Sequence, residues 1–169
     1  MLVSVVSLKR FQEEMELQNP DAVISIVNPT MDNPEVGREI PTLKMKFHDI
    51  CFEIKSYHGQ ERYTPPSRDH VDEIFHFGTF KYKKGTKLLT HCFAGISRSS
   101  AAAIIALCPH YGYVEAVRMV SEIDVYQSEG LYEKGSLWFM PNNLMIQYAD
   151  ERLALDGALV RLVEETFAY

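Results

Sequence analysis

One stretch of the chain, KLLTHCFAGISRSSAAAIIAL at residues 87–107, constrains the fold more than any other. Its beginning, KLLTH, is a short apolar run typical of a buried strand. Its end is apolar on nearly all sides, which is typical of a helix in the protein interior. Gly95 lies in the loop between them, where it permits a tight curl of the backbone. The stretch therefore predicts a buried strand that passes through a tight loop into a buried central helix.

Three other segments have strand patterns. LVSVVS at 2–7 is a short run rich in β-branched residues. AVISIVN at 22–28 is continuously apolar and β-branched, which predicts an interior parallel strand. TLKMKFHDI at 42–50 alternates apolar residues with lysines, and this alternation indicates an edge or half-covered strand.

Helical patterns separate and follow these strands. Ser67 is the expected N-cap of one helix, and the helix that begins near Arg98 is expected to stop at Pro109. The other predicted helices are LKRFQEEMELQ, YVEAVRMVSEI, PNNLMIQYADERLAL and GALVRLVEETF. Strands that alternate with helices predict an α/β fold, with a central, mostly parallel sheet of four or five strands flanked by helices.

Composition limits the class of protein. A length of 169 residues without a composition break predicts a single domain over residues 1–169. The net charge of −6 argues against nucleic-acid or anionic-membrane partners, which require a surplus of Lys and Arg. No apolar run reaches the roughly 18 residues that a membrane helix needs, so a soluble, cytoplasmic protein is expected. The histidines have no metal-ligand spacing, and neither a metal nor another cofactor is expected.

The loop HCFAGISRSS has the chemistry of a phosphate site. It leaves the carboxyl end of a strand and enters a helix, which is where open α/β sheets bind ligands. Its backbone N–H groups can converge on one anion, and this electropositive cup would favour Cys92 as a thiolate. Arg98 offers a planar fork for two oxygens of a tetrahedral anion. An inert buried cysteine is the alternative, but it leaves the inward-facing arginine unexplained, because an unpaired buried guanidinium is costly.

His91, Cys92, Arg98 and Ser99, spaced as H-C-x5-R-S, resemble the signature loop of the cysteine-dependent protein tyrosine and dual-specificity phosphatases. SIVNP, FHDI and PNNLMIQYADERL are similar to further segments of that family, so the resemblance extends over nearly the whole chain. The combination is similar to small bacterial tyrosine-phosphatase-like proteins. The resemblance implies a phosphotyrosine protein phosphatase-like fold and hydrolysis of a phosphomonoester through a phosphocysteine intermediate.

The resemblance also implies a role for each matching residue of the loop. Cys92 would attack phosphorus, and Ser99 would hydrogen-bond its sulfur or serve only as a helix-cap hydroxyl. His91 would orient the loop, with a purely structural buried histidine as the equal alternative. The side chain of Arg98 and backbone amides would hold the phosphate oxygens. These amides belong to Phe93, Ala94, Gly95, Ile96, Ser97 and Arg98.

A general acid must protonate the leaving oxygen, and it contributes a factor of roughly 10² to 10⁴ in rate. Asp49 follows a predicted strand and matches the family's aspartate in order along the chain. Its spacing from Cys92 is longer than usual in the family, so Asp69 and Asp72 remain alternatives. Asn142 matches the family's Pro-Asn position, where it would support the loop or position water, or it would simply cap a helix.

The expected substrate is a phosphorylated protein or a small phosphomonoester. A phosphoinositide or nucleotide phosphatase is one alternative, although the loop lacks the basic residues that extra phosphates would require. A phosphate-binding pseudophosphatase is a second alternative, and a sulfur-transfer enzyme or an arsenate reductase is a remote third.

Two further questions stay open at the level of sequence. The three cysteines form no CxxC pair; Cys51 or Cys108 could form a regulatory disulfide with Cys92, but buried inert thiols are favoured. The aromatic residues of two long loops could line a phenyl ring, although packing against the core is favoured. These residues are Tyr57, Tyr63, Trp138 and Phe139.

Overall fold

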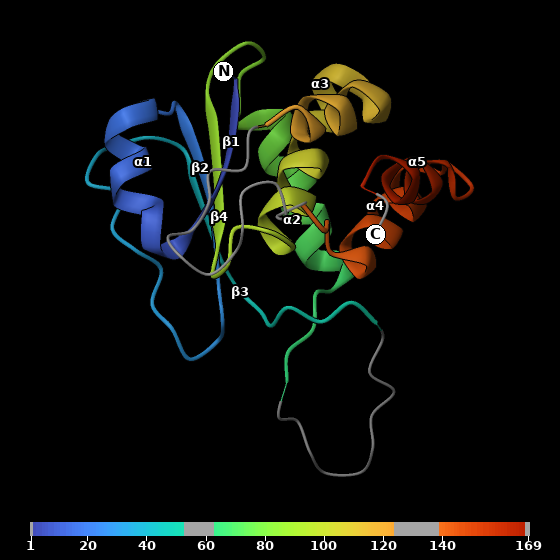
Figure 1. The fold of residues 1–169 in the computed structure, drawn as a ribbon, viewed down its shortest axis with the longest axis horizontal. Coiled ribbons are helices and arrows are strands. Elements are labelled where there is room, and N and C mark those ends of the chain that lie inside the picture. Colours follow the sequence, from blue (N-terminus) through green and yellow to red (C-terminus); the bar gives the residue numbers. More distant parts are fainter. Residues whose placement is uncertain (1, 53–62, 124–138, 168–169) are drawn as a thin grey trace, which may run out of the picture.

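The computed structural model describes residues 2–52, 63–123 and 139–167. Within these ranges a four-stranded parallel sheet lies at the centre, with helices on both faces (Figure 1). The order across the sheet is β1-β4-β2-β3. The strands are β1 Val3–Ser7, β2 Ala22–Val27, β3 Thr42–Lys46 and β4 Leu88–Cys92. This arrangement confirms the predicted α/β fold class.

The position of each strand in the sheet agrees with its sequence pattern. β2 pairs with β3 on one side and β4 on the other, and all of its residues are buried. β3 is an edge strand in which Met45 is buried and the flanking lysines are exposed. The predictions of an interior strand at 22–28 and an edge strand at 42–50 are therefore confirmed.

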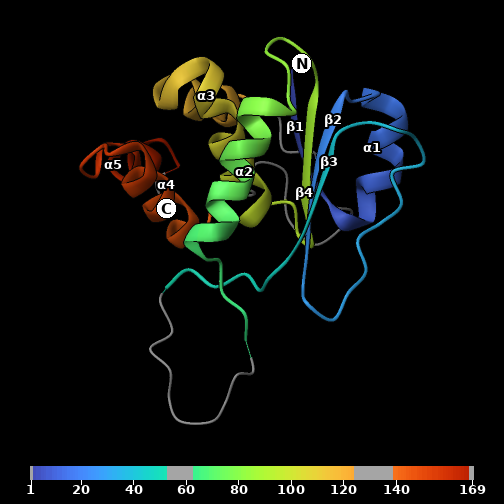
Figure 2. The ribbon, with the colours of Figure 1, turned by 180° about the vertical axis from the view of Figure 1, so that it is seen from behind.

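The helices are distributed unequally over the two faces (Figures 1 and 2). A short 3-10 turn, η1 Leu8–Arg10, leads into α1 Phe11–Gln18, which covers one face. The other helices lie on the opposite face. They are α2 Arg68–Phe80, α3 Arg98–Ser121, α4 Asn143–Leu153 and α5 Ala158–Thr166.

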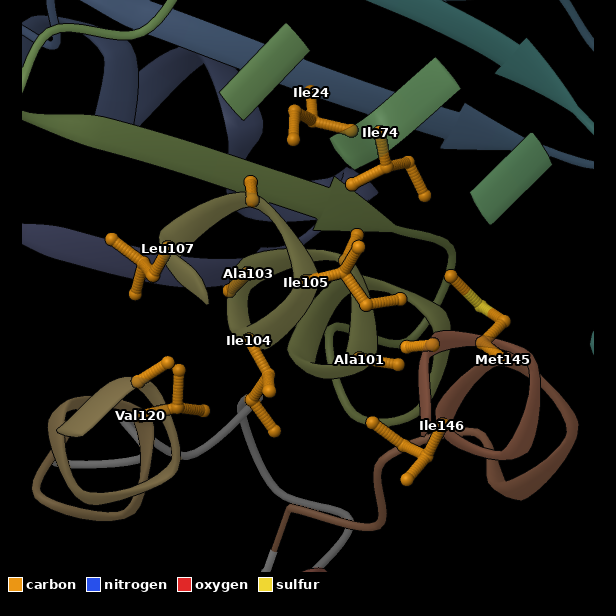
Figure 3. Packing of buried hydrophobic residues seen from close by; sticks show 14 of the residues in the cluster. Ile24, Ile74, Ala101, Ala103, Ile104, Ile105, Leu107, Val120, Met145 and Ile146 are labelled. Atoms are coloured by element: carbon orange, nitrogen blue, oxygen red, sulfur yellow. The ribbon is translucent and has the colours of Figure 1, made fainter. Parts of the chain in front are cut away.

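The main core surrounds α3. Ile104 and Ile105 are fully buried, and α3 runs between the sheet and α4 (Figure 3). α2 approaches α3 closely at Gly78, where a Cβ atom would collide with the backbone of Ala106. A smaller cluster on the other face packs Phe11 of α1 against the sheet. The sheet is thus buried on both sides, as its apolar strands require.

One helix boundary differs from the sequence prediction. The helix that was expected to stop at Pro109 continues through it and breaks at Gly112, which has φ 75° and ψ 163°. Proline fixes φ near a helical value, so the chain can pass through it at the cost of one hydrogen bond. Only glycine adopts the conformation found at residue 112 without steric strain, and the break falls there.

Side chains accept hydrogen bonds at the N-termini of α2 and α5. Ser67 caps α2, as predicted, by accepting a hydrogen bond from the His70 amide. The carboxylate of Asp150 in α4 accepts hydrogen bonds from the amides of Gly157 and Leu159 at the start of α5.

None of the helices in the described ranges has the length and apolar character needed to cross a membrane.

Candidate active site

The signature loop lies where the carboxyl ends of the parallel strands meet. Cys92 is the last residue of β4, and Arg98 is the first residue of α3. The amide of Leu8, just beyond β1, donates to the carbonyl of Phe93 at 3.2 Å. Gly95 has φ 74°, and a Cβ atom there would lie 2.5 Å from the amide nitrogen of Ser7. The loop therefore packs so tightly against the end of β1 that only glycine fits.

Cys92 lies at the bottom of this loop, and the residue is 1% exposed. The Gly95 amide donates to its Sγ at 3.3 Å, and Ser99 Oγ lies 3.1 Å from the same sulfur. Hydrogen-bond donors directed at a sulfur stabilise the thiolate form. The structure thus brings Cys92 and Ser99 together, with the Gly95 amide directed at the same sulfur.

Arg98 is held by two acceptors from the sheet. Its side chain is 3% exposed, and its Nη1 donates to Asn28 Oδ1 at 2.9 Å and to the carbonyl of Phe47 at 2.6 Å. Its buried Nε has no hydrogen-bond partner among the residues that the structure describes, and it lies 3.9 Å from Asp49 Oδ2. One edge of the guanidinium is therefore anchored, and a donor remains for an anion in the cup.

Sequence reasoning missed Asn28 as a residue of the site. It directly follows the interior strand β2, at the edge of the sheet where β4 also ends. That position was the available signal, because a polar side chain after the carboxyl end of an interior parallel strand faces the ligand-binding edge.

Asp49 lies at the mouth of the cup. Its Oδ1 accepts hydrogen bonds from Ser97 Oγ at 2.7 Å and from Asn142 Nδ2 at 2.8 Å. Its other oxygen, Oδ2, faces Arg98 Nε at 3.9 Å. The structure therefore joins Asp49 to the signature loop, with one carboxyl oxygen held and the other directed toward Arg98.

Asn142 performs two tasks that the sequence presented as alternatives. Its Oδ1 accepts from the Met145 amide and caps α4, and its Nδ2 donates to Asp49 and to the Ile50 carbonyl. The backbone amide of Asn142 donates to the carbonyl of Ser97 at 3.1 Å. A single buried residue thus connects α4, the Asp49 segment and the signature loop.

His91 lies beneath the loop and is fully buried. Its Nε2 is 2.7 Å from Ser25 Oγ, which also accepts a hydrogen bond from Asn33, and its ring lies against Phe11. Burial penalises the charged imidazolium and lowers the pKa of His91 to about 4. A neutral, packed ring of this kind fits an orienting role better than that of a base at neutral pH.

Solved structures share this architecture. The crystal structure of human DUSP28 matches with a TM-score of 0.57 at 16% identity, covering 92% of this chain and 94% of that chain. The crystal structure of DUSP15 matches with a TM-score of 0.54 at 16% identity, covering 99% of this chain and 93% of that chain. This chain has the dual-specificity phosphatase fold. The human tyrosine phosphatase-like serine/threonine/tyrosine-interacting protein also matches, with a TM-score of 0.54 at 18% identity, covering 90% and 87%. No protein-family model and no curated protein matches the sequence.

The alternative acids lie elsewhere on this dual-specificity phosphatase fold. Asp69 and Asp72 are exposed on α2, and Asp72 pairs with Arg152 of α4. Neither carboxylate has a hydrogen bond or an ion pair to the signature loop within the described ranges. Among the three candidates, Asp49 is the one that the structure brings to the cup.

The three cysteines are free thiols in the structure. Cys108 is buried in α3, and burial raises the pKa of its thiol to about 12, which fits the prediction of an inert residue. Cys51 is exposed, so the prediction of a buried thiol is wrong there. Partial desolvation and the nearby charge of Asp49 nevertheless raise the pKa of Cys51 and reduce its reactivity.

The aromatic residues of the long loops have different environments. Phe139 is buried in the core, as favoured, whereas Tyr63 is exposed and lies edge-on to His48. Tyr57 and Trp138 lie outside the described residues. The expectation of core packing is therefore confirmed for Phe139 and wrong for Tyr63.

Proposed function

We propose that this protein is a cysteine-dependent phosphomonoesterase that hydrolyses phosphotyrosine, with or without phosphoserine and phosphothreonine, in protein substrates. One observation carries the proposal. Cys92, hydrogen-bonded by Gly95 and Ser99, shares a cup with Arg98, and Asp49 is held at the mouth of that cup. Nucleophile, anion clamp and proton donor are the three groups that transfer of a phosphoryl group to sulfur requires.

The first half-reaction transfers the phosphoryl group to the protein. The Cys92 thiolate attacks phosphorus, the S–P bond forms and the ester P–O bond breaks. The proton of a protonated Asp49 goes to the leaving oxygen, so that an alcohol or phenol departs. Arg98 and the loop amides hold the three non-bridging oxygens as charge shifts among them.

The second half-reaction restores the enzyme. Water attacks the phosphocysteine and loses a proton to the Asp49 carboxylate, while the S–P bond breaks and inorganic phosphate forms. Cys92 leaves as a thiolate, and Ser99 and the Gly95 amide stabilise that charge. The protein returns to its starting protonation state, with Asp49 protonated.

The test is hydrolysis of a small aryl phosphate without added metal, followed from about pH 5 to pH 8. Cys92→Ser should abolish turnover, and Asp49→Asn should lower kcat by roughly 10² to 10⁴ and remove the fall in rate at the basic end of the profile. Asp72→Asn is the matched control, because it changes an exposed carboxylate paired on another surface. An inactive wild type, or an active Cys92→Ser variant, would refute the proposal.

A further inference from the structure

The segments that build the cup and its mouth carry exposed apolar side chains. The described residues include eight exposed large hydrophobic side chains, and four of them belong to segments that build the site. We call these four the apolar rim. They are Phe52, Tyr63, Phe93 and Met140. Exposed apolar side chains gathered in one place are typical of a binding surface, whereas scattered ones need no explanation.

Hydrogen bonds place the rim on different sides of the cup. Phe93 belongs to the signature loop, and its carbonyl accepts from Leu8 next to β1. Met140 lies on the side of α4, where its amide donates to the carbonyl of Ile96 at 3.4 Å.

The other two rim residues lie on the side of Asp49. Phe52 follows Cys51, whose Sγ lies 3.5 Å from Asn142 Nδ2. Tyr63 contacts His48, the neighbour of Asp49, through its ring. Each rim residue therefore belongs to, or adjoins in sequence, a segment that contacts the cup or the Asp49 segment.

The cup itself suits a single phosphate. Between Cys92 and Arg98 the loop contains Gly95 and four residues with side chains, and none of these side chains is charged. The four residues are Phe93, Ala94, Ile96 and Ser97. Anion affinity would thus come from backbone amides and from Arg98 rather than from charged side chains within the loop. The exposed side chains that the structure describes next to the cup at Phe93 and Met140 are apolar.

We propose that the apolar rim binds large apolar side chains that flank the phosphorylated residue of a protein substrate. The inference rests on the proposed phosphatase function. The segments that carry the rim contact the cup, so atoms that adjoin a phosphate at Cys92 would lie near exposed apolar side chains, and covering apolar surface is favourable. A lipid phosphomonoester is disfavoured, because binding to an anionic membrane surface requires basic residues and the chain has a net charge of −6.

The test measures binding to the Cys92→Ser protein, so that it does not depend on turnover. Three phosphotyrosine peptides differ only in the residues that flank the phosphotyrosine. The first has Leu and Phe as flanking residues, the second has only Ser, and the third has Asp and Glu. Vesicles of phosphatidylcholine with a minor share of phosphatidic acid provide the lipid arm. The peptide with apolar flanks should bind about tenfold more tightly than the peptide with serine flanks.

Substitutions in the rim locate the preference. In the Cys92→Ser background, Phe52→Ser and Met140→Ser should each reduce the ratio of affinities for the two peptides by roughly threefold or more. Phe80→Ser is the matched control, because Phe80 at the end of α2 and Phe52 are both 69% exposed. This control should leave the ratio unchanged.

Each outcome decides the inference. Equal affinities for the peptides with apolar and serine flanks, or a preference that the rim substitutions leave intact, would overturn it. Tighter binding to the vesicles than to every peptide would also overturn it, in favour of a lipid substrate. Failure of the proposed function is seen separately, as a lack of turnover of the aryl phosphate by the wild-type protein.

Discussion

The base and the mouth of the cup are built in different ways. At the base, Cys92, Arg98 and Ser99 are almost fully buried, and their positions follow from the end of β4 and the start of α3. At the mouth, Asp49 is exposed and is held by the side chains of Ser97 and Asn142. Cys92 is thus fixed by the fold, whereas the position of Asp49 depends on a few hydrogen bonds. Changes at the base should therefore have larger effects than changes to Ser97 and Asn142, the residues that hold Asp49 at the mouth.

Among variants that keep both Cys92 and Asp49, the largest effect is expected from Arg98→Lys at the base. A lysine cannot hold Asn28 and the Phe47 carbonyl while also presenting a planar fork to phosphate. We expect kcat on an aryl phosphate to fall by roughly 10² to 10³. Arg161→Lys, at an exposed position of α5, is the control and should retain full activity. Near-normal activity of Arg98→Lys would show that the base tolerates change as the mouth does.

The second predicted effect is on the free energy of unfolding, and it comes from His91, which lies beneath the signature loop. Burial lowers its pKa from 6.5 to about 4, so the unfolded chain binds a proton at a pH where the folded chain does not. Protonation of the unfolded chain therefore lowers the free energy of unfolding at acid pH. This free energy keeps its full value above about pH 6.5 and decreases as the pH falls toward 4, by about 3 kcal/mol at most.

Urea unfolding at a series of pH values measures this loss. His91→Asn should remove this part of the pH dependence, while His76→Asn, at an exposed position of α2, should keep it. A wild-type protein whose unfolding free energy does not depend on His91 in this pH range would contradict the prediction.

A smaller effect is expected at the mouth from Asn142→Ser. Serine preserves an N-cap acceptor for α4, but its side chain is too short to hold Asp49. We expect kcat to fall roughly tenfold, the equivalent of one hydrogen bond to a charged group, with little change in the free energy of unfolding. Asn142→Ala should lose the cap as well, at a cost of about 1 kcal/mol in stability. Equal loss of activity and stability in both variants would mean that Asn142 acts only as a cap.

The smallest effect is expected from Ser97→Ala. This change removes one of the two donors to Asp49 Oδ1 and leaves Asn142 in place. Because the contact is partly exposed to water, we expect kcat to fall by roughly two- to threefold. Ser121→Ala, on the exposed end of α3, is the control. A loss as large as that of Arg98→Lys would remove the distinction between base and mouth.

The same contrast separates what the sequence could predict from what it could not. Interior and edge strands were predictable, because burial on two faces or one leaves different apolar patterns at β2 and β3. Pro109 was misleading because its φ is compatible with a helix, and the glycine that ends the first part of α3 follows it closely.

At the site, residues adjacent to Cys92 in sequence were predictable from the loop, since local geometry places them. Asn28 was missed because its contact with Arg98 arises only when β2 and β4 lie side by side. The two roles of Asn142 could not be separated, because different atoms of one amide perform them. Asp49, Asp69 and Asp72 look alike in sequence, and only tertiary structure shows which of them faces Arg98.

The link between Asn142 and Asp49 has a consequence for biosynthesis. The strands and the signature loop are all complete once the chain has been translated through α3, so the nucleophile can form early. Ser97, one of the two donors to Asp49, is translated by then, but the other, Asn142, follows only with the start of α4. A nascent chain on the ribosome would therefore carry an assembled thiol pocket before its acid is fixed, and full turnover would begin only after residue 142 has emerged.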